Sequence, residues 1–277
     1  IYQIPKYQRE YSWGKRQWSV LFEDLLENDH GYFLGSIICI NQSEDTLQTS
    51  VLELIDGQQR MATLSILLMA IYSILQGKRE LLSEDQQSEL TNIKFRLVLK
   101  KNPSLHRLVL QSQNNNQDDY SSKLASLRIG EASSIAPNNA GNRRIYHSFS
   151  YFLKQLNTIS TEGTEIDKII TFYEKVLSAI IVKIEVKDHS KAHMLFESLN
   201  NRGLPLTPTD MIKNKLFATL EQKYPKKVGI YLKSWNEIIN HLGDKSLNQE
   251  RFLRQFYNAF RSDLQKQGKA PLARKSN

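Results

Sequence analysis

A strand, a tight turn and a helix follow one another in residues 51–71, VLELIDGQQRMATLSILLMAI. The first five residues form a short apolar run rich in strand-forming side chains. Asp56 and Gly57 interrupt this run, because Gly reaches backbone angles closed to other residues and Asp is a good helix N-cap. From Met61 onward, apolar residues recur with helical spacing. The stretch therefore predicts a strand that leads through one turn into a long helix.

The polar residues at this turn suit an anion. A helix N-terminus presents unpaired N–H groups and a partial positive charge, which favour a phosphate group. Arg60 in the first turn would add a bidentate partner for phosphate oxygens. A simpler interpretation makes Asp56 the cap and Gly57 the turn and leaves the next three side chains in solvent. Residue types alone do not choose between the two interpretations.

Residues 4–13, IPKYQREYSW, concentrate aromatic and hydrogen-bonding side chains. Pro5 disfavours a helix and predicts an extended segment. Tyr7, Gln8, Arg9 and Tyr11 could stack on a base or close over a nucleotide. The alternative is that the aromatic rings pack on the core and the arginine pairs with a carboxylate.

The remaining periodicity predicts an α+β fold. If the β-branched strand at 179–186 pairs with the strand at 51–55, residues 76–178 are a helical insertion inside one core. A second strand is predicted at 32–40 and leads into a hairpin loop at 41–50, and residues 111–144 are predicted to form a long loop with one short helical piece. The last 60 residues are predicted to form two or three basic helices. The other predicted helices lie at 17–26, 61–75, 80–99, 146–156, 167–177 and 190–199.

Residues 196–217, FESLNNRGLPLTPTDMIKNKLF, hold a helix end followed by a helix start. Thr207 reads as the N-cap of the second helix, which capping explains fully, and Asp210 as its N3 residue, which could either cap the helix or reach a ligand. Capping does not account for four other polar residues of this segment, and these are candidate ligand-binding side chains: Asn200, Arg202, Lys213 and Asn214.

Composition is that of a soluble globular protein, with 40% hydrophobic and 24% charged residues. We expect no membrane span, since no apolar run approaches about 18 residues. Cys39 is the only cysteine and reads as a small core residue, which agrees with a cytoplasmic location. The chain opens on Ile1 close to a motif, so we expect its true N-terminus to lie further upstream.

Positive charge gathers in the last part of the chain. Of the net charge of +8, residues 221–277 supply a surplus of seven, with 12 Lys/Arg against 5 Asp/Glu. Such a region favours a polyanion such as nucleic acid, although ordinary solubility is an equal alternative. The six histidines lie far apart, and no phosphate-binding P-loop or Rossmann fingerprint is present, so we expect no metal centre built from protein side chains alone.

Four stretches together resemble one family. IPKYQREYSW, YFLGSI at 32–37, IDGQQR at 55–60 and residues 196–217 occur in the order found in the N-terminal domain of GmrSD-type restriction endonucleases. That family is similar in fold to ParB and sulfiredoxin proteins, which hold nucleotide phosphates at an equivalent turn. The resemblance implies a small ParB/sulfiredoxin-like mixed sheet in a core at 1–220, followed by a basic helical region at 221–277.

The resemblance also implies a function. We expect a module of an anti-phage restriction endonuclease that binds and hydrolyses a nucleoside triphosphate with Mg²⁺. We also expect it to sense modified DNA for a nuclease domain or subunit that this chain lacks. A homo-oligomer is compatible with this role. The alternatives are a non-catalytic reader of modified DNA and a protein-interaction scaffold.

The implied roles fall on particular residues. Those expected to act in catalysis are Asp56, Gln58, Gln59 and Arg60. Those expected to bind nucleotide or phosphate are Tyr7, Gln8, Arg9, Tyr11, Gly57, Thr63, Asn200, Arg202, Lys213 and Asn214.

Overall fold

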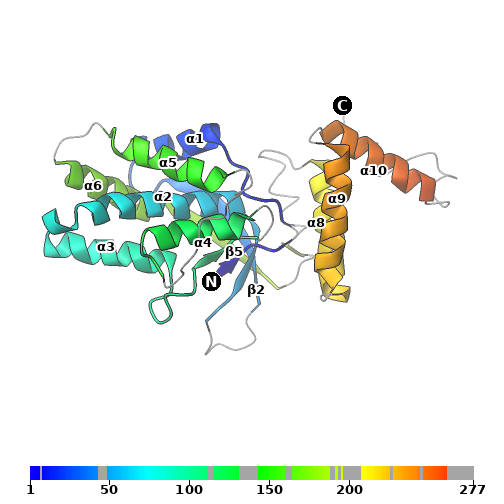
Figure 1. Ribbon diagram of the computed structural model, residues 1–277, viewed down its shortest axis with the longest axis horizontal. Helices are drawn as coiled ribbons and strands as arrows, with labels where there is room; N and C mark the ends of the chain where they lie inside the picture. The colour runs from blue at the N-terminus through cyan, green and yellow to red at the C-terminus, as the bar shows by residue number, and fades with distance from the viewer. Residues whose placement is uncertain are drawn as a thin grey trace. The chain divides into compact units, whose positions relative to one another are not determined.

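A computed structural model describes the chain in two compact units, Ile1–Ala192 and His193–Asn277. The described residues are 1–260 without 7, 43–48, 112–114, 131–142, 160–163, 188–190, 193–194, 196–206, 225–226 and 244–245. The first unit combines a mixed sheet with helices, so the predicted α+β class is confirmed (Figure 1). The ParB/sulfiredoxin-like detail and the proposed division near residue 220 stay predictions.

The first unit is built on a five-stranded sheet with the order β4-β1-β3-β2-β5. Its strands are β1 (Tyr2–Gln3), β2 (Phe33–Asn41), β3 (Leu52–Asp56), β4 (Leu108–Val109) and β5 (Ile180–Val186). β2 runs antiparallel to β3, whereas the pairs β1–β3, β1–β4 and β2–β5 are parallel. The return strand β5 thus joins the core beside β2, and not beside β3 as the sequence suggested.

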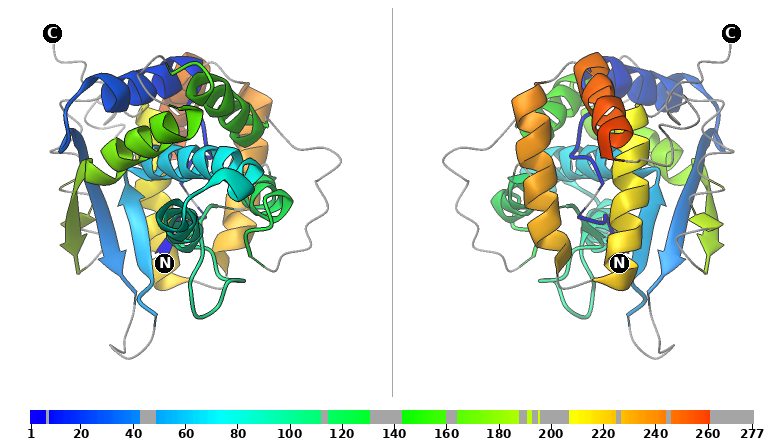
Figure 2. Two further views of the ribbon diagram at one scale, coloured as in Figure 1. Left: turned by 90° about the vertical axis from the view of Figure 1, so that its left-hand side faces the viewer. Right: turned by 90° about the vertical axis from the view of Figure 1, so that its right-hand side faces the viewer.

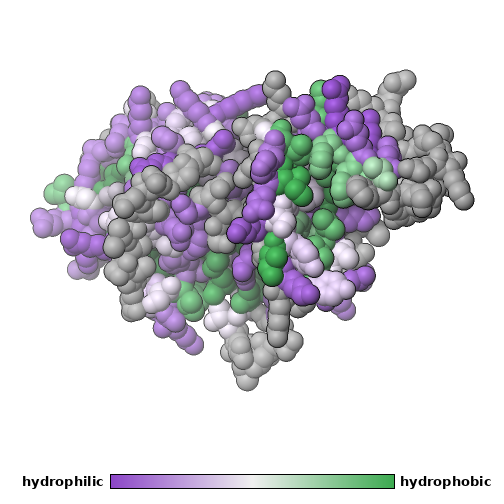
Figure 3. Space-filling view, turned by 45° about the vertical axis from the view of Figure 1, so that its right-hand side comes forward, coloured by the Kyte–Doolittle hydropathy of each residue, from purple (hydrophilic) through white to green (hydrophobic). Residues whose placement is uncertain are grey.

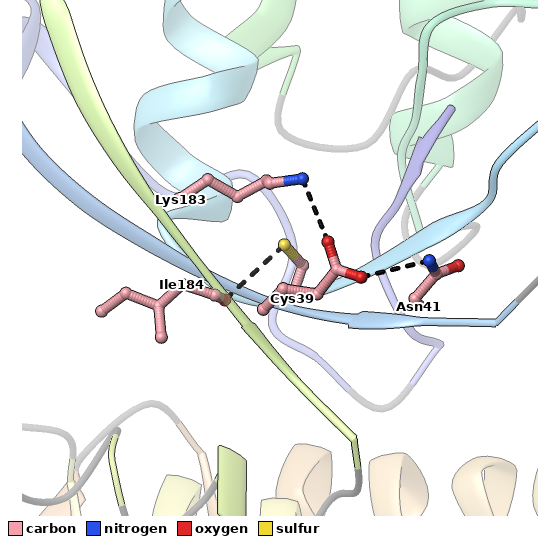
Figure 4. Close-up of polar contacts among 5 residues, drawn as sticks. Cys39, Asn41, Lys183 and Ile184 are labelled. Atoms are coloured by element: carbon pink, nitrogen blue, oxygen red, sulfur yellow. Dashed lines mark hydrogen bonds and ion pairs between the residues drawn. The ribbon is translucent and has the colours of Figure 1, made fainter.

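Polar contacts reinforce the β2–β5 pair near its end (Figure 4). The amide of Asn41 donates to Glu185 Oε1 over 3.1 Å, and Lys183 Nζ donates to Glu185 Oε2 over 3.0 Å. The thiol of Cys39 lies 3.8 Å from the carbonyl oxygen of Ile184. Cys39 is fully buried, as expected of a small core residue, and burial raises the pKa of its thiol.

Helices gather on one side of this sheet, with α2 among them (Figure 2). α2 packs against several of the others, because its buried side chains include Ile66, Leu67 and Ile71. The helices of this unit are α1 (Lys15–Glu27), α2 (Gln58–Gly77), α3 (Glu84–Leu97), α4 (Asn116–Ser126), α5 (Arg144–Leu156) and α6 (Glu165–Ser178), with a 3₁₀ turn at Arg79–Leu81.

By length and composition alone α2 could cross a membrane, which differs from the expectation drawn from the sequence. Half of its apolar stretch is buried inside the protein. A buried central helix of a globular unit has the same composition, so its place in the core accounts for this feature.

Most boundaries follow the predicted periodicity, and the misses have physical reasons. β1 and β4 each have two residues, too few for any alternation to be visible. α4 lies inside the Asn- and Gln-rich stretch at 111–144, where one short helical piece is predicted, and this prediction is confirmed. The predicted helix at 190–199 falls largely outside the described residues, as does the segment 131–142.

The second unit is helical where it is described. Its helices are α8 (Pro208–Lys223), α9 (Val228–Leu242) and α10 (Ser246–Phe260). Trp235 and Phe217 are buried, with ring centroids 6.1 Å apart in an edge-to-face arrangement. α9 and α10 agree with the helices predicted for this end of the chain, but α9 itself is not basic, since it carries Lys233 against Glu237.

Gly57 fixes the connection between β3 and α2. Its φ of 84° lies in the left-handed region, and a Cβ at this position would come within 2.5 Å of Ile37 Cγ2. Gly57 is therefore the N-cap residue, and the helix begins at Gln58 rather than at Met61. Asp56 ends the strand instead of capping the helix, which corrects the simpler reading of this turn.

We expect Gly57→Ala to lower the free energy of unfolding by roughly 2–4 kcal/mol, because it combines a left-handed backbone with a steric clash. Urea unfolding followed by circular dichroism measures the change. Gly77→Ala is the matched control, because an added Cβ at Gly77 would meet no atom within 4 Å. A loss at Gly57 no larger than that at Gly77 would contradict this account.

Candidate functional site

The first turn of α2 sends its polar side chains to different neighbours. Gln58 Nε2 donates to Gln8 Oε1 over 3.2 Å, and Gln8 Nε2 donates to the carbonyl of Ile55 over 3.1 Å. Both glutamines are buried, with 8% and 6% of their surface exposed. Gln58 Oε1 is buried without a hydrogen-bond partner in the described part of the chain, which is costly unless a ligand or water supplies a donor.

Gln59 holds the motif segment at residues 10–13 against the helix. Its Oε1 accepts hydrogen bonds from the backbone N–H groups of Ser12 at 2.8 Å and Trp13 at 3.2 Å. Its Nε2 donates to the carbonyl of Glu10 at 2.9 Å. The whole amide of Gln59 is thus engaged in positioning this segment.

Arg60 extends from α2 to β2, the strand that pairs with β3. Its Nη1 donates to the carbonyl of Ser36 at 2.9 Å, and a Cβ on Gly35 would lie 3.1 Å from its Nη2. The absent side chain of Gly35 therefore lets the guanidinium lie against β2. Within the described chain no other hydrogen bond uses this guanidinium, so N–H groups remain for a ligand.

Asp56 and Arg60 form the charged part of the turn. Burial raises the pKa of Asp56, while the backbone N–H of Gly57 and the positive charges of Arg60 and Arg9 act in the opposite direction. Burial lowers the pKa of Arg60, and Asp56 opposes that shift. The turn thus places a partly buried carboxylate and a partly buried guanidinium beside one helix N-terminus.

Tyr11 and Thr63 serve the packing of this region. The hydroxyl of Tyr11 lies 2.8 Å from Thr63 Oγ1 and accepts a hydrogen bond from Trp18 Nε1, also at 2.8 Å. Thr63 Oγ1 in turn donates to the carbonyl of Gln59 at 2.7 Å. Thr63 is fully buried, so its hydroxyl belongs to the packed interior.

A small cavity lies beside Gln58. Its volume is about 10 Å³, roughly the space that one water molecule needs. Arg9, Tyr11, Gln58 and Gln59 line it together with Gln111 and Asn116, which the sequence reading did not single out. Asn116 Oδ1 also accepts the backbone N–H of Tyr11 at 3.2 Å. The spacing of Asn116, Tyr120 and Leu124 on one helix face was the available signal.

The structure brings together only part of the predicted set. Asp56, Gln58, Gln59, Arg60, Gly57, Gln8, Tyr11 and Thr63 gather around the β3–α2 turn, and Arg9 is exposed beside it. Tyr7, Asn200 and Arg202 lie outside the described residues. Lys213 and Asn214 belong to α8 in the second unit, and their closing of the site stays a prediction.

Comparison with known proteins bears on this arrangement. The family described as the GmrSD restriction endonuclease, N-terminal domain, matches residues 1–217. The chain belongs to this family. No curated protein matches it. Membership makes it a module of a restriction endonuclease, a defence enzyme that acts on DNA, and the matched range contains the complete β3–α2 turn.

Replacing Gln59 by Leu should lower the free energy of unfolding by about 2–4 kcal/mol, because it leaves several backbone groups of residues 10–13 without partners. Hydrogen exchange of the Ser12 and Trp13 amides should accelerate at the same time. Gln76→Leu, the same change near the other end of α2, is the control and should stay within about 0.5 kcal/mol of wild type. Equal stability of the two variants would show that the Gln59 contacts contribute nothing.

Asp56→Asn should stabilise the protein at neutral pH. The pKa of Asp56 is raised in the folded protein, so the folded state binds a proton more tightly than the unfolded state does. The protonated carboxyl therefore stabilises the fold at low pH. This stabilisation is lost as the pH rises above the pKa of Asp56 in the unfolded chain, about 3.9, and through its higher pKa in the folded protein. Urea unfolding across this range should show the gap between variant and wild type shrinking as the pH falls.

Proposed function

We propose that this chain is the nucleotide-binding and DNA-sensing module of its restriction endonuclease, with a nucleoside triphosphate held at the β3–α2 turn. Cleavage of DNA belongs in this proposal to a separate nuclease domain or subunit. The observation that carries the proposal is the pairing of Arg60, with unused N–H groups, and the N-terminus of the 20-residue helix α2 at one turn.

Several features of the turn fit a phosphate group. Helix N–H groups and a guanidinium fork are the two protein groups best suited to phosphate oxygens. Gly35 leaves room for the guanidinium beside the strand, and Gly57 carries no side chain over the helix entrance. The unpartnered Oε1 of Gln58 would accept a hydrogen bond from water or from a ligand N–H group.

The carboxylate of Asp56 favours binding of a divalent cation together with the phosphate. Its carboxylate lies where a phosphate would otherwise meet only positive groups, and two anions side by side repel each other. Mg²⁺ commonly bridges one or two protein carboxylates and substrate phosphates, so a single aspartate is sufficient. Bound here, Mg²⁺ would neutralise phosphate charge, while Asp56 and Arg60 orient the group and Gln58 orients water.

The second unit supports a nucleic-acid partner. Aromatic side chains are exposed on and just before its helices α9 and α10, namely Tyr224, Tyr231, Phe252 and Phe256. Exposed basic residues Lys227, Lys233 and Arg251 lie on the same elements. Figure 3 shows that hydrophobic and hydrophilic residues lie side by side on the face toward the viewer. Aromatic faces combined with positive charge suit stacking on bases along a phosphate backbone.

We expect wild-type protein to bind a nucleoside triphosphate with Mg²⁺ and Arg60→Ala to bind it at least about tenfold more weakly, since hydrogen bonds to charged groups contribute about 1.5–3 kcal/mol. Calorimetric titration of ATP, GTP and CTP measures the affinities. Arg16→Ala, at an exposed position on α1, is the matched control and should bind like wild type.

Equal nucleotide affinity of Arg60→Ala and wild type would sink the assignment of the turn. Phosphate release with and without DNA then separates turnover from binding alone. If no nucleotide binds but DNA does, with a preference for modified bases, the chain is a non-catalytic reader and the proposed nucleotide site is wrong. Loss of DNA binding in modest salt without any such preference would favour the interaction scaffold.

A further inference from the structure

A second, larger hollow is lined by residues of the sheet and of the helices α2, α3 and α6. Its volume is about 450 Å³, within the usual range for small-molecule pockets. One wall is a stripe of α2 formed by Met61, Leu64 and Leu68, and Ile181 of β5 and Leu177 of α6 also line the pocket. We call this hollow the apolar groove.

The stripe on α2 is less buried than the rest of the helix. Met61, Leu64 and Leu68 are only partly buried, whereas Ile66, Leu67 and other side chains of α2 are completely buried. Leu177 at the rim has 38% of its surface exposed. The groove is thus a solvent-accessible apolar surface, which gains free energy when a ligand covers it.

Two arginines supply the charge of the groove. Arg96 follows Phe95 on α3, and Arg107 stands next to β4. Both guanidinium groups are anchored through Nε, Arg96 to the hydroxyl of Tyr173 at 3.2 Å and Arg107 to the carbonyl of Phe95. Phe95 precedes Arg96 on α3, and its carbonyl oxygen accepts from Arg107, so Phe95 links the two arginines that line the groove.

The Nη groups of both guanidinium groups remain available to a ligand. In the described part of the chain neither arginine makes an ion pair with a carboxylate, and their only side-chain hydrogen bonds use Nε. Anchoring through Nε leaves the two Nη groups of each guanidinium, which match the two oxygens of a carboxylate. The groove therefore combines an apolar wall with a site for one anionic group.

We propose that the apolar groove binds an amphipathic carboxylate, with its alkyl chain along the α2 stripe and its carboxylate on Arg96 and Arg107. An apolar ligand without charge would leave the two guanidinium groups unused, and a highly charged nucleotide would leave the apolar wall uncovered. A single carboxylate at the end of an alkyl chain satisfies both parts. This ligand is distinct from the nucleotide at the β3–α2 turn.

The test uses decanoate, at concentrations below micelle formation, with the complete chain. Calorimetric titration should show one binding site in wild type. The double variant Arg96→Gln/Arg107→Gln should bind decanoate at least about tenfold more weakly, because it loses charge-assisted hydrogen bonds. Leu177→Asp, which adds a negative charge at the exposed rim, should weaken binding by a similar factor.

Three controls decide the outcome. Arg16→Gln removes an exposed arginine elsewhere and should leave binding unchanged. Decanol keeps the chain without the charge, and acetate keeps the charge without the chain, so both should bind far more weakly than decanoate. Undiminished binding by the double variant, or decanol binding equal to decanoate binding, would overturn the proposal. Circular dichroism of each variant verifies that the fold is intact, and Leu177→Asp provides an independent reading if the double variant does not fold.

Discussion

The left-handed backbone at Gly57 is the constraint on which the site depends. Because Ile37 approaches this glycine so closely, β2 and the entrance of α2 are locked together, and the helix begins at Gln58. The position of that first residue sets the direction of the next two. With 3.6 residues per turn, Gln58, Gln59 and Arg60 must diverge, toward Gln8, toward the segment at 10–13 and toward β2.

Because the side chains diverge, some residues of this short motif hold the fold together and others are available to bind a ligand. Gln59 uses its whole amide to hold backbone groups, so it contributes to any ligand site mainly by placing residues 10–13, which follow Arg9 and include Tyr11. Arg60 and Asp56 keep charge that the fold does not need for packing, and burial makes that charge costly. A ligand that pairs with both groups would offset the cost, which is the physical basis for assigning a phosphate with a cation to this turn.

Sequence periodicity predicted the elements that bury a regular apolar face, such as β2 and α5, and the family motifs predicted which turn matters. The helix start was placed three residues late, because the first turn of α2 is polar yet buried through hydrogen bonds rather than apolar contacts. The same reason hid Asn116, whose amide packs beside the cavity from a segment with a loop-like composition. Tertiary hydrogen bonding leaves no periodic trace in the sequence, so pattern analysis could not find these polar contacts, although the helical spacing of Asn116, Tyr120 and Leu124 was visible.

α2 contributes residues to both candidate ligand sites of the first unit, the β3–α2 turn and the apolar groove. Arg60 ends the polar turn, and its neighbour Met61 begins the stripe that lines the apolar groove. A ligand at either place would order the same helix and the strands packed beside it. If occupancy of one changes the affinity of the other, linkage requires the effect to be equal in both directions, so the two affinities can be compared in one protein. The helix that carries the family motif would then couple ligand binding at the β3–α2 turn to ligand binding in the apolar groove.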